Sequence, residues 1–368
     1  MQRRVLIHLL VGLLLFLVSS CGDGPSLRIG FLGTFTGRFS DLSMSGHNGA
    51  ILAVEECNKA GGIQGRTVEL LEEDDRADEA SALAGLRSLE SRGCVAVVGP
   101  MISKTALPVA AEATRLNLVV VGPTISTNQL TGIDDSFFRV YTPSEYTSRQ
   151  LAREVHALGM RRVIGLYDLT NRAHTEGAYF AFRDEFLKLG GEVLPPITFA
   201  ANEQPSFTSL AHRVVDQGAD SVFVLMSTMD TALFSQCLWK LRSKLLLCCS
   251  DWSGTGDLAE FAGRSIDGLV FLHSMDPQAN RAWVANYRKR FGKTPDFAAL
   301  RCYEAAWVLL QALAKDPARA TLRTQLLGLR SFQVGESLIE FDAFGDVVRS
   351  HHPYRFVAGK MEPLHPNP

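Results

Sequence analysis

Polar side chains that could hold a small charged group follow two apolar segments in the first half of the chain. Residues 94–99 and 118–122 are almost continuously apolar, as is typical of strands in a covered parallel sheet. The polar residues shortly after them are Ser103, Lys104, Thr105, Thr124 and Ser126. Hydroxyls and backbone N–H groups at this edge of a sheet suit an anion such as a carboxylate. Each hydroxyl taken alone could equally cap the following helix.

The second half of the chain offers a complementary set of side chains. Asp251 and Trp252 follow the apolar run 245–250, and His174 follows the run 163–167. A carboxylate after a strand suits a cation such as an ammonium group, and donors facing an acid would form a cleft for a zwitterion. Asp251 could also be a surface acid, Trp252 a core residue and His174 a solvated loop residue.

The patterns that signal enzymes are missing from the sequence. It has no GxSxG, HExxH or Walker motif, and no GxGxxG after the first predicted strand. The cysteine spacings do not resemble a zinc site. We therefore expect a binding protein that is not an enzyme and that needs no metal or cofactor.

The positions of these side chains depend on strands and helices that alternate along the chain. Apolar, β-rich runs occur at 27–33, 94–99, 118–122, 163–167, 221–226, 245–250 and 268–273, with helical periodicity between them. The series restarts near Pro143, and the chain becomes helical after His273. We predict an α/β fold with two Rossmann-like parallel-sheet domains.

Composition narrows the class of protein. A chain of 368 residues suits two domains, and its net charge of −2 comes without a basic tract interleaved with aromatic residues. Nucleic acid is therefore not an expected partner. Six cysteines follow Cys21, and they could form disulfides or act as small buried hydrophobic residues.

The first residues resemble an export signal. Two arginines precede an apolar run at 5–18, and Ser19, Ser20 and Cys21 follow. The run is shorter than the ~20 residues that a spanning helix needs. The VSSC sequence matches the bacterial lipoprotein pattern, with a lipid on Cys21. The alternative is a secretory signal with an incidental cysteine.

Five segments together resemble a known family, and they span nearly all of the expected mature chain. They are IGFLGTFTG, NGAILAVEECNKAGGIQGRTVELLEEDD, VAVVGPMISKTALPVA, LVVVGPTISTNQLT and FFRVYTPSE. The chain is similar to type I periplasmic binding proteins, specifically the branched-chain amino acid receptors of ABC transporters. The resemblance implies two lobes joined by a three-crossover hinge. We expect residues 27–142 plus 275–331 in one lobe and 143–274 plus 332–360 in the other.

The resemblance also implies roles for individual residues. It assigns Ser103, Thr124 and Ser126 to the ligand carboxylate and Asp251 to its ammonium group. Leu42 and His174 stand where the family carries aromatic residues that contact the ligand. Ala77 and Ile102 occupy the positions of the family's early disulfide, and Lys104 adds a cation beside Ser103.

The function expected from this resemblance is solute capture outside the cytoplasm. A monomer, lipid-anchored in the periplasm or cell envelope, would bind a small amino acid or related carboxylate and deliver it to the permease of an ABC importer. Two alternatives remain at this point. One is a receptor that presents a small organic acid or amide to a membrane signalling partner, and the other is an exported α/β enzyme.

Overall fold

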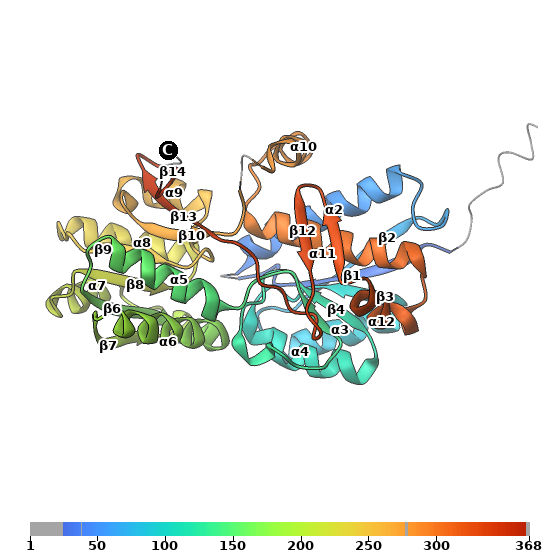
Figure 1. Cartoon of the computed structure of the whole chain (residues 1–368), viewed down its shortest axis with the longest axis horizontal. Coiled ribbons are helices and arrows are strands. Elements are labelled where there is room, and N and C mark those ends of the chain that lie inside the picture. Colours follow the sequence, from blue (N-terminus) through green and yellow to red (C-terminus); the bar gives the residue numbers. More distant parts are fainter. Residues whose placement is uncertain (1–24, 38, 277–278, 366–368) are drawn as a thin grey trace, which may run out of the picture.

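A computed structural model describes residues 25–37, 39–276 and 279–365. The expected signal segment and Cys21 lie outside these residues. The chain forms two lobes side by side, each built on its own β-sheet (Figure 1). The predicted fold class, two parallel-sheet lobes, is confirmed.

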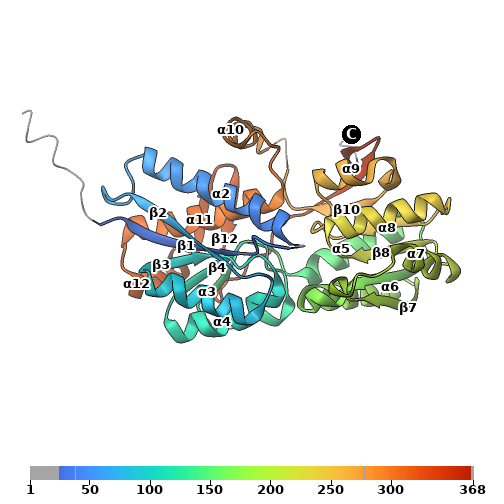
Figure 2. The same ribbon diagram turned by 180° about the vertical axis from the view of Figure 1, so that it is seen from behind.

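The first lobe holds a five-stranded parallel sheet in the order β2-β1-β3-β4-β5. Its strands are β1 (Leu27–Gly33), β2 (Val68–Asp74), β3 (Cys94–Val98), β4 (Val119–Gly122) and β5 (Phe137–Arg139). Helices cover both faces, which buries almost all of β3 and β4. Figure 2 shows α2 and α11 above the sheet and α3 and α4 below it. The lobe's helices are α2 (Ser40–Lys59), α3 (Glu79–Ser91), α4 (Ser103–Leu116), α10 (Arg281–Phe291), α11 (Phe297–Lys315) and α12 (Arg319–Leu329).

The second lobe holds a seven-stranded sheet in the order β14-β13-β10-β9-β8-β6-β7. Its strands are β6 (Arg162–Asp168), β7 (Glu192–Phe199), β8 (Ser221–Leu225), β9 (Leu246–Cys249), β10 (Val270–His273), β13 (His352–Val357) and β14 (Lys360–Pro363). Only β13 and β14 run antiparallel to their neighbours. Its helices are α5 (Ser144–Ala157), α6 (Arg172–Lys188), α7 (Phe207–Asp216), α8 (Thr228–Lys240) and α9 (Gly256–Ala262). Buried side chains of α5 and α6 form one core with the sheet, and those of α7, α8 and α9 form another.

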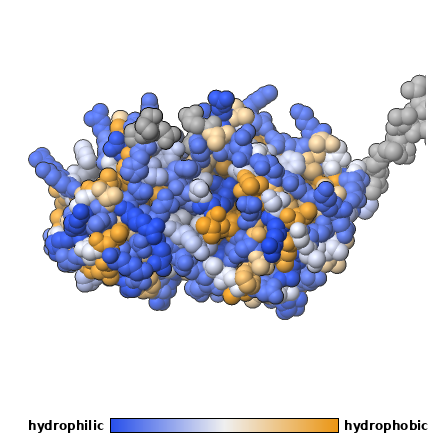
Figure 3. All heavy atoms as spheres, viewed as in Figure 1, coloured by the Kyte–Doolittle hydropathy of each residue, from blue (hydrophilic) through white to orange (hydrophobic). Residues whose placement is uncertain are grey.

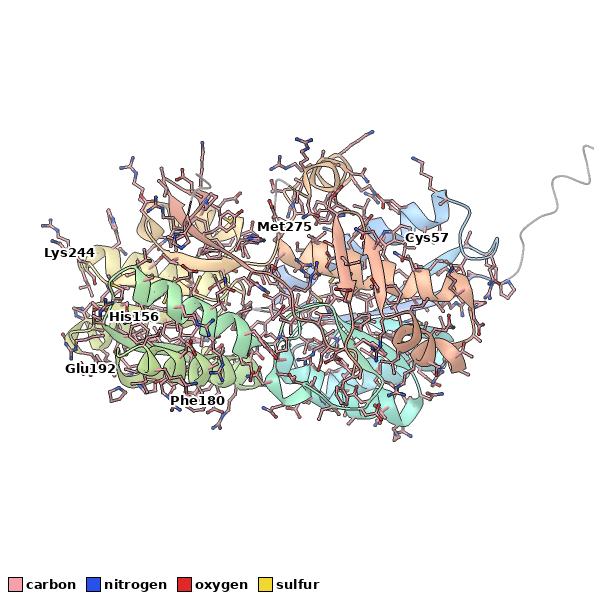
Figure 4. All side chains as sticks on the ribbon, in the orientation of Figure 1. Cys57, His156, Phe180, Glu192, Lys244 and Met275 are labelled. Carbon is pink, nitrogen blue, oxygen red and sulfur yellow. The ribbon has the colours of Figure 1, made fainter. Side chains whose placement is uncertain are left out.

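The chain passes between the lobes three times, as the resemblance implied, but the last passage comes later than predicted. The hairpin of β11 (Ser331–Val334) and β12 (Ser337–Glu340) was expected in the second lobe. Phe332, Ile339 and Phe341 instead lie in the same core as α2 and α11 of the first lobe. The Arg139 guanidinium also donates a hydrogen bond to Asp346 Oδ1 over 2.8 Å. The first lobe therefore keeps the chain until about Val347, because the apolar face of the hairpin is buried there. Figure 4 labels Met275, which lies where the chain passes from the second lobe back to the first.

Several elements were absent from the sequence prediction. Strand β7 contains Pro195 and Pro196, which normally argue against a strand, but β7 is an edge strand where missing N–H donors cost little. Helix α3 carries a clear start signal that could have predicted it, because the Asp78 side chain accepts a hydrogen bond from the Ser81 N–H.

The six cysteines after Cys21 are all free, and five of them are buried. The five buried cysteines therefore pack as small hydrophobic residues. Helix α11 is the one helix of the described residues with the length and composition of a membrane span, but most of it is buried in the first lobe.

On the face shown in Figure 3, hydrophilic residues predominate and hydrophobic ones form separate groups.

We predict that Gly49→Ala destabilises the first lobe. A Cβ atom at Gly49 in α2 would lie 1.9 Å from the carbonyl oxygen of Ala299 in α11, so the two helix backbones would have to separate. Overpacking of this kind costs about 1–3 kcal/mol. Chemical denaturation would measure the loss. Gly328→Ala in α12 is the matched control, because a Cβ there meets nothing within 4 Å and alanine favours a helix. Equal stability of both variants would contradict the close approach.

Candidate functional site

A cavity lies between the lobes at the carboxyl ends of their strands. Both lobes line it, with Leu42, Met101, Ile102, Ser103, Thr124, Ser126, Tyr141 and Phe297 from the first and Asn171, His174, Asp251 and Trp252 from the second. Seven of the predicted ligand-binding residues are in this set. The space open to the centres of water-sized spheres is only about 30 Å³. Because one water needs about 10–15 Å³ by this measure, the cavity has room for only about two or three water molecules.

The first lobe contributes hydroxyl groups that already have protein partners. Thr124 Oγ1 donates a hydrogen bond to the carbonyl oxygen of Met101 over 2.6 Å. Ser126 Oγ and His174 Nδ1 share a hydrogen bond of 2.8 Å across the cleft. Ser103 is the first residue of α4 and is buried at the cavity wall.

Lys104 and Thr105 were predicted to contact the ligand, but their side chains point away from the cavity. Lys104 Nζ donates to the carbonyl oxygen of Ala77 over 3.2 Å. Thr105 Oγ1 lies 3.2 Å from Asp75 Oδ2, behind the start of α4. Asp75 is buried, so these hydrogen bonds serve the loop after β2 rather than the cleft.

The backbone N–H of Lys104 takes part in a second contact between the lobes. It donates to Asn171 Oδ1 of the second lobe over 3.2 Å. This N–H belongs to the first turn of α4, where backbone donors lack partners within the helix. Asn171 therefore satisfies one of them when the lobes are closed.

Asp251 projects into the floor of the cavity, where the Tyr141 hydroxyl donates a hydrogen bond to its carboxylate. Burial raises the pKa of Asp251 to about 6, although the hydrogen bond from Tyr141 and the charge of Arg301 oppose this rise. Burial and the neighbouring carboxylate raise the pKa of Tyr141 well above its usual value. Tyr141 therefore stays protonated and remains a donor to Asp251.

Arg301 adds positive charge near Asp251 that Glu304 neutralises only in part, because Glu304 pairs with two arginines. Its guanidinium pairs with the buried Glu304 over 2.5 Å, and Arg349 pairs with the same carboxylate. Arg301 also donates to the carbonyl oxygen of Ser274 in the second connection between the lobes. Both arginines are therefore held by α11 and the hinge.

Aromatic rings form much of the remaining cavity wall. Trp252 stacks on Phe39 with a centroid distance of 5.9 Å, and its ring meets that of His174 edge-on at 5.5 Å. Tyr141 and Phe297 pack with centroids 5.8 Å apart. Leu42 lines the cavity where an aromatic residue was expected, and Phe39 supplies an aromatic ring three residues earlier.

His174 is a neutral wall residue with one unused polar atom. Burial lowers its pKa to about 4, and its Nε2 atom is buried without a hydrogen-bond partner in the structure. A buried polar atom of this kind normally finds a partner, so Nε2 is available to a bound solute.

Tyr141, Phe297, Met101 and Asn171 were not among the predicted ligand-binding residues. Asn171 follows β6 and could have been found by the rule that selected His174. Tyr141 and Phe297 gave no such signal, because one lies in a connection between lobes and the other at the start of a long core helix.

We predict that Asp251→Asn stabilises the fold at neutral pH. The pKa of Asp251 in the folded protein is about 6, against about 3.9 for an unperturbed Asp. The charged form is therefore disfavoured by folding, and stability is lost as pH rises from 4 through 6. The variant should gain up to about 3 kcal/mol at pH 7 and lose this advantage towards pH 4.

Urea denaturation at several pH values would measure this difference. Glu112→Gln is the control of opposite sign, because Arg115 and Arg87 lower the pKa of Glu112 to about 2. That variant should lose stability at neutral pH. A wild-type protein more stable than Asp251→Asn at pH 7 would contradict the cost assigned to the buried charge.

Comparison with known proteins agrees with this architecture. The Leu/Ile/Val-binding protein homolog 3 of Brucella melitensis is 22% identical over 258 residues, which cover 70% of this chain and 69% of that protein. A branched-chain amino acid transporter substrate-binding protein from Streptococcus pneumoniae, solved with isoleucine, superposes with a TM-score of 0.85 at 20% identity, covering 92% of this chain and 98% of that one. A solute-binding protein from R. palustris, solved with benzoate, gives 0.81 at 18% identity, covering 92% and 95%.

A family model decides the classification. The model described as periplasmic binding protein matches residues 26–359, which is most of the chain. Periplasmic binding proteins are not enzymes, in agreement with the sequence-based expectation. The chain belongs to the periplasmic binding protein family.

Proposed function

We propose that this protein is the extracytoplasmic solute-binding component of an ABC importer, with a small amino acid or related carboxylate as its ligand. The observation that carries this proposal is the cavity enclosed between the two lobes, with Asp251 on one side and the hydroxyls of Ser103 and Ser126 on the other. The names of the Brucella and Streptococcus proteins support the amino acid class, and the benzoate complex extends it to other carboxylates.

In this proposal the ligand lies across the cleft. Its ammonium group donates to Asp251, whose carboxylate can accept further hydrogen bonds besides that from Tyr141. Its carboxylate faces Ser103, and its side chain meets Leu42 and the ring of Trp252. Since these residues come from different lobes, the ligand makes its full set of contacts only when the lobes are closed.

Closure then works as a shift between two states. A ligand stabilises the closed form only by the difference between its affinities for the closed and open forms. The permease of the importer would bind the closed, loaded protein and receive the solute when the lobes open. A lipid on Cys21 would keep the protein at the membrane beside that permease, and two or more acyl chains suffice for stable anchoring.

The ligand class can be tested by isothermal titration with leucine, isoleucine, valine and alanine. We expect saturable binding of at least one, and a loss of about 30-fold or more in Asp251→Ala, because removing one partner of a buried charge pair leaves the other unpaired. Asp267→Ala is the control, since Asp267 is exposed and lies at the far end of the second lobe. Silence of these four and of the remaining amino acids would remove the amino acid class.

The anchor can be tested by replacing Cys21. In Cys21→Ser the acceptor of the lipid is gone, so the protein should move from the membrane fraction to the soluble fraction of the cell envelope. Cys237→Ser, at a half-buried free cysteine, should stay with the membrane. Normal cleavage and unchanged membrane association of Cys21→Ser would contradict the lipoprotein assignment.

A further inference from the structure

We propose that the carboxyl end of α10, with Arg288, Lys289 and Lys293, docks on an anionic lipid surface and holds the first lobe against the membrane. This inference rests on the proposed lipid attachment at Cys21 and adds a second, reversible contact to it. It comes from the charge of this helix, from its position at the edge of the molecule and from the short chain that leads to Cys21.

The segment that forms α10 is strongly basic. Between residues 280 and 295 there is no Asp or Glu, and the basic residues are Arg281, Arg288, Lys289, Arg290 and Lys293. Cations in the last turn stabilise a helix through its dipole, which accounts for part of this charge. The dipole does not account for Arg281 in the first turn, where a cation is unfavourable, or for Lys293, which follows the helix. The positive charge thus exceeds what the stability of the helix needs.

Three cations at the carboxyl end of α10 find no carboxylate among the described residues. The Arg288 guanidinium donates to a neutral hydroxyl group over 2.9 Å, so its charge is not neutralised. Lys289 and Lys293 are exposed. By contrast, Arg290 pairs with Glu55 of α2 over 2.8 Å and fastens the helix to the lobe.

Acids near α10 are engaged within the lobe. Glu56 of α2 accepts hydrogen bonds from the Asn286 amide and the Tyr303 hydroxyl. The carboxylate of Asp296 accepts a hydrogen bond from the Ser45 hydroxyl over 2.6 Å. These carboxylates serve the contacts of α10 and α11 with α2, so the outer face of α10 keeps its positive charge.

The packing of α10 turns this basic face outward. Tyr287 is buried and packs with Leu52 of α2 and Ala299 of α11. Because an α-helix turns about 100° per residue, Lys289 lies almost opposite Tyr287. Figures 1 and 2 show α10 at the outer edge of the molecule, beyond α2 and α11. The basic face is therefore free to meet a flat surface.

The proposed attachment point is close to the helix that carries α10. The carbonyl oxygens of Pro25 and Ser26 accept hydrogen bonds from Arg66, which fixes the start of the described chain beside the loop that follows α2. Cys21 precedes Pro25 by four residues, which span at most about 14 Å. Since α10 packs on α2, a membrane that lies along α2 would meet both the lipid on Cys21 and the basic end of α10.

The strength expected of this contact is modest. A basic residue near an anionic lipid surface raises the affinity about fivefold, so three raise it about 100-fold. A single myristoyl chain binds more strongly than this and still gives only marginal, reversible attachment. The contact therefore orients a protein that a lipid already holds, and Cys21→Ser is still expected in the soluble fraction.

Vesicle binding of the purified Cys21→Ser protein tests the inference, because this variant binds without help from a lipid anchor. Flotation at low ionic strength would compare vesicles of phosphatidylglycerol and phosphatidylcholine in equal amounts with vesicles of phosphatidylcholine alone. We expect binding to the anionic vesicles to be tighter by at least about 100-fold and to weaken as salt is added. Equal binding to both vesicles, or binding to neither, would overturn the inference and leave the anchor and the solute site as proposed.

Removal of the three cations localises the contact. Arg288→Gln, Lys289→Gln and Lys293→Gln, combined in the Cys21→Ser protein, should weaken binding to the anionic vesicles by about 100-fold. Thermal unfolding would check the fold of this variant, since cations in the last turn also stabilise α10.

The matched control removes the same charge at the far end of the second lobe, where Figure 4 labels Lys244. It combines Lys240→Gln, Arg242→Gln and Lys244→Gln, at three exposed residues at and after the end of α8. We expect this variant to keep most of the binding to anionic vesicles. An equal or larger loss in the control would show that net charge or the second lobe is responsible, and would overturn the assignment to α10.

Discussion

The site is organised around the carboxylate of Asp251, which lies partly buried between the two lobes. An isolated ionised carboxylate in an apolar interior costs far more than one hydrogen bond returns, so Asp251 must find partners or take up a proton. The structure gives it the Tyr141 hydroxyl, and burial still raises the pKa of Asp251 to about 6. The charge of Arg301 offsets only part of this rise. In the proposed function, the ammonium group of a solute would supply further positive charge at this carboxylate.

Helix α11 connects this site to the hinge. Its first residue, Phe297, lines the cavity, and Arg301 and Glu304, one and two turns later, form a buried ion pair. Arg301 holds the second connection between the lobes through the Ser274 carbonyl oxygen, and Glu304 holds the third through Arg349. Because α11 packs backbone against backbone on α2 near Gly49, it cannot move independently of the first lobe. Two connections between the lobes are thus held by a helix that belongs to the first lobe.

The sequence predicted the sheets well, because near-continuous apolar strands and periodic helices are strong local signals. It also predicted Ser103, Ser126, His174 and Asp251 at the cavity, since the ends of parallel strands share an edge. It could not predict the direction of a long side chain, and Lys104 turned away to the Ala77 carbonyl. Nor could it predict contacts between lobes, such as those of Tyr141 and Asn171, which depend on how closure aligns distant segments. The hairpin at 331–340 was assigned to the wrong lobe, because its apolar residues alone do not show which lobe it packs against.

These contacts between the lobes affect how strongly a ligand must favour the closed form over the open form. Asn171 and His174 give the first lobe's donors partners as soon as the lobes meet, with no solute required. Each such hydrogen bond contributes about 0.5–1.5 kcal/mol, so the empty closed form is less costly than it would be with unsatisfied donors. A ligand can bias the equilibrium only through interactions that the open form lacks. In the proposed function, part of that difference would come from the ammonium contact at Asp251 and from the aromatic side chains beside it.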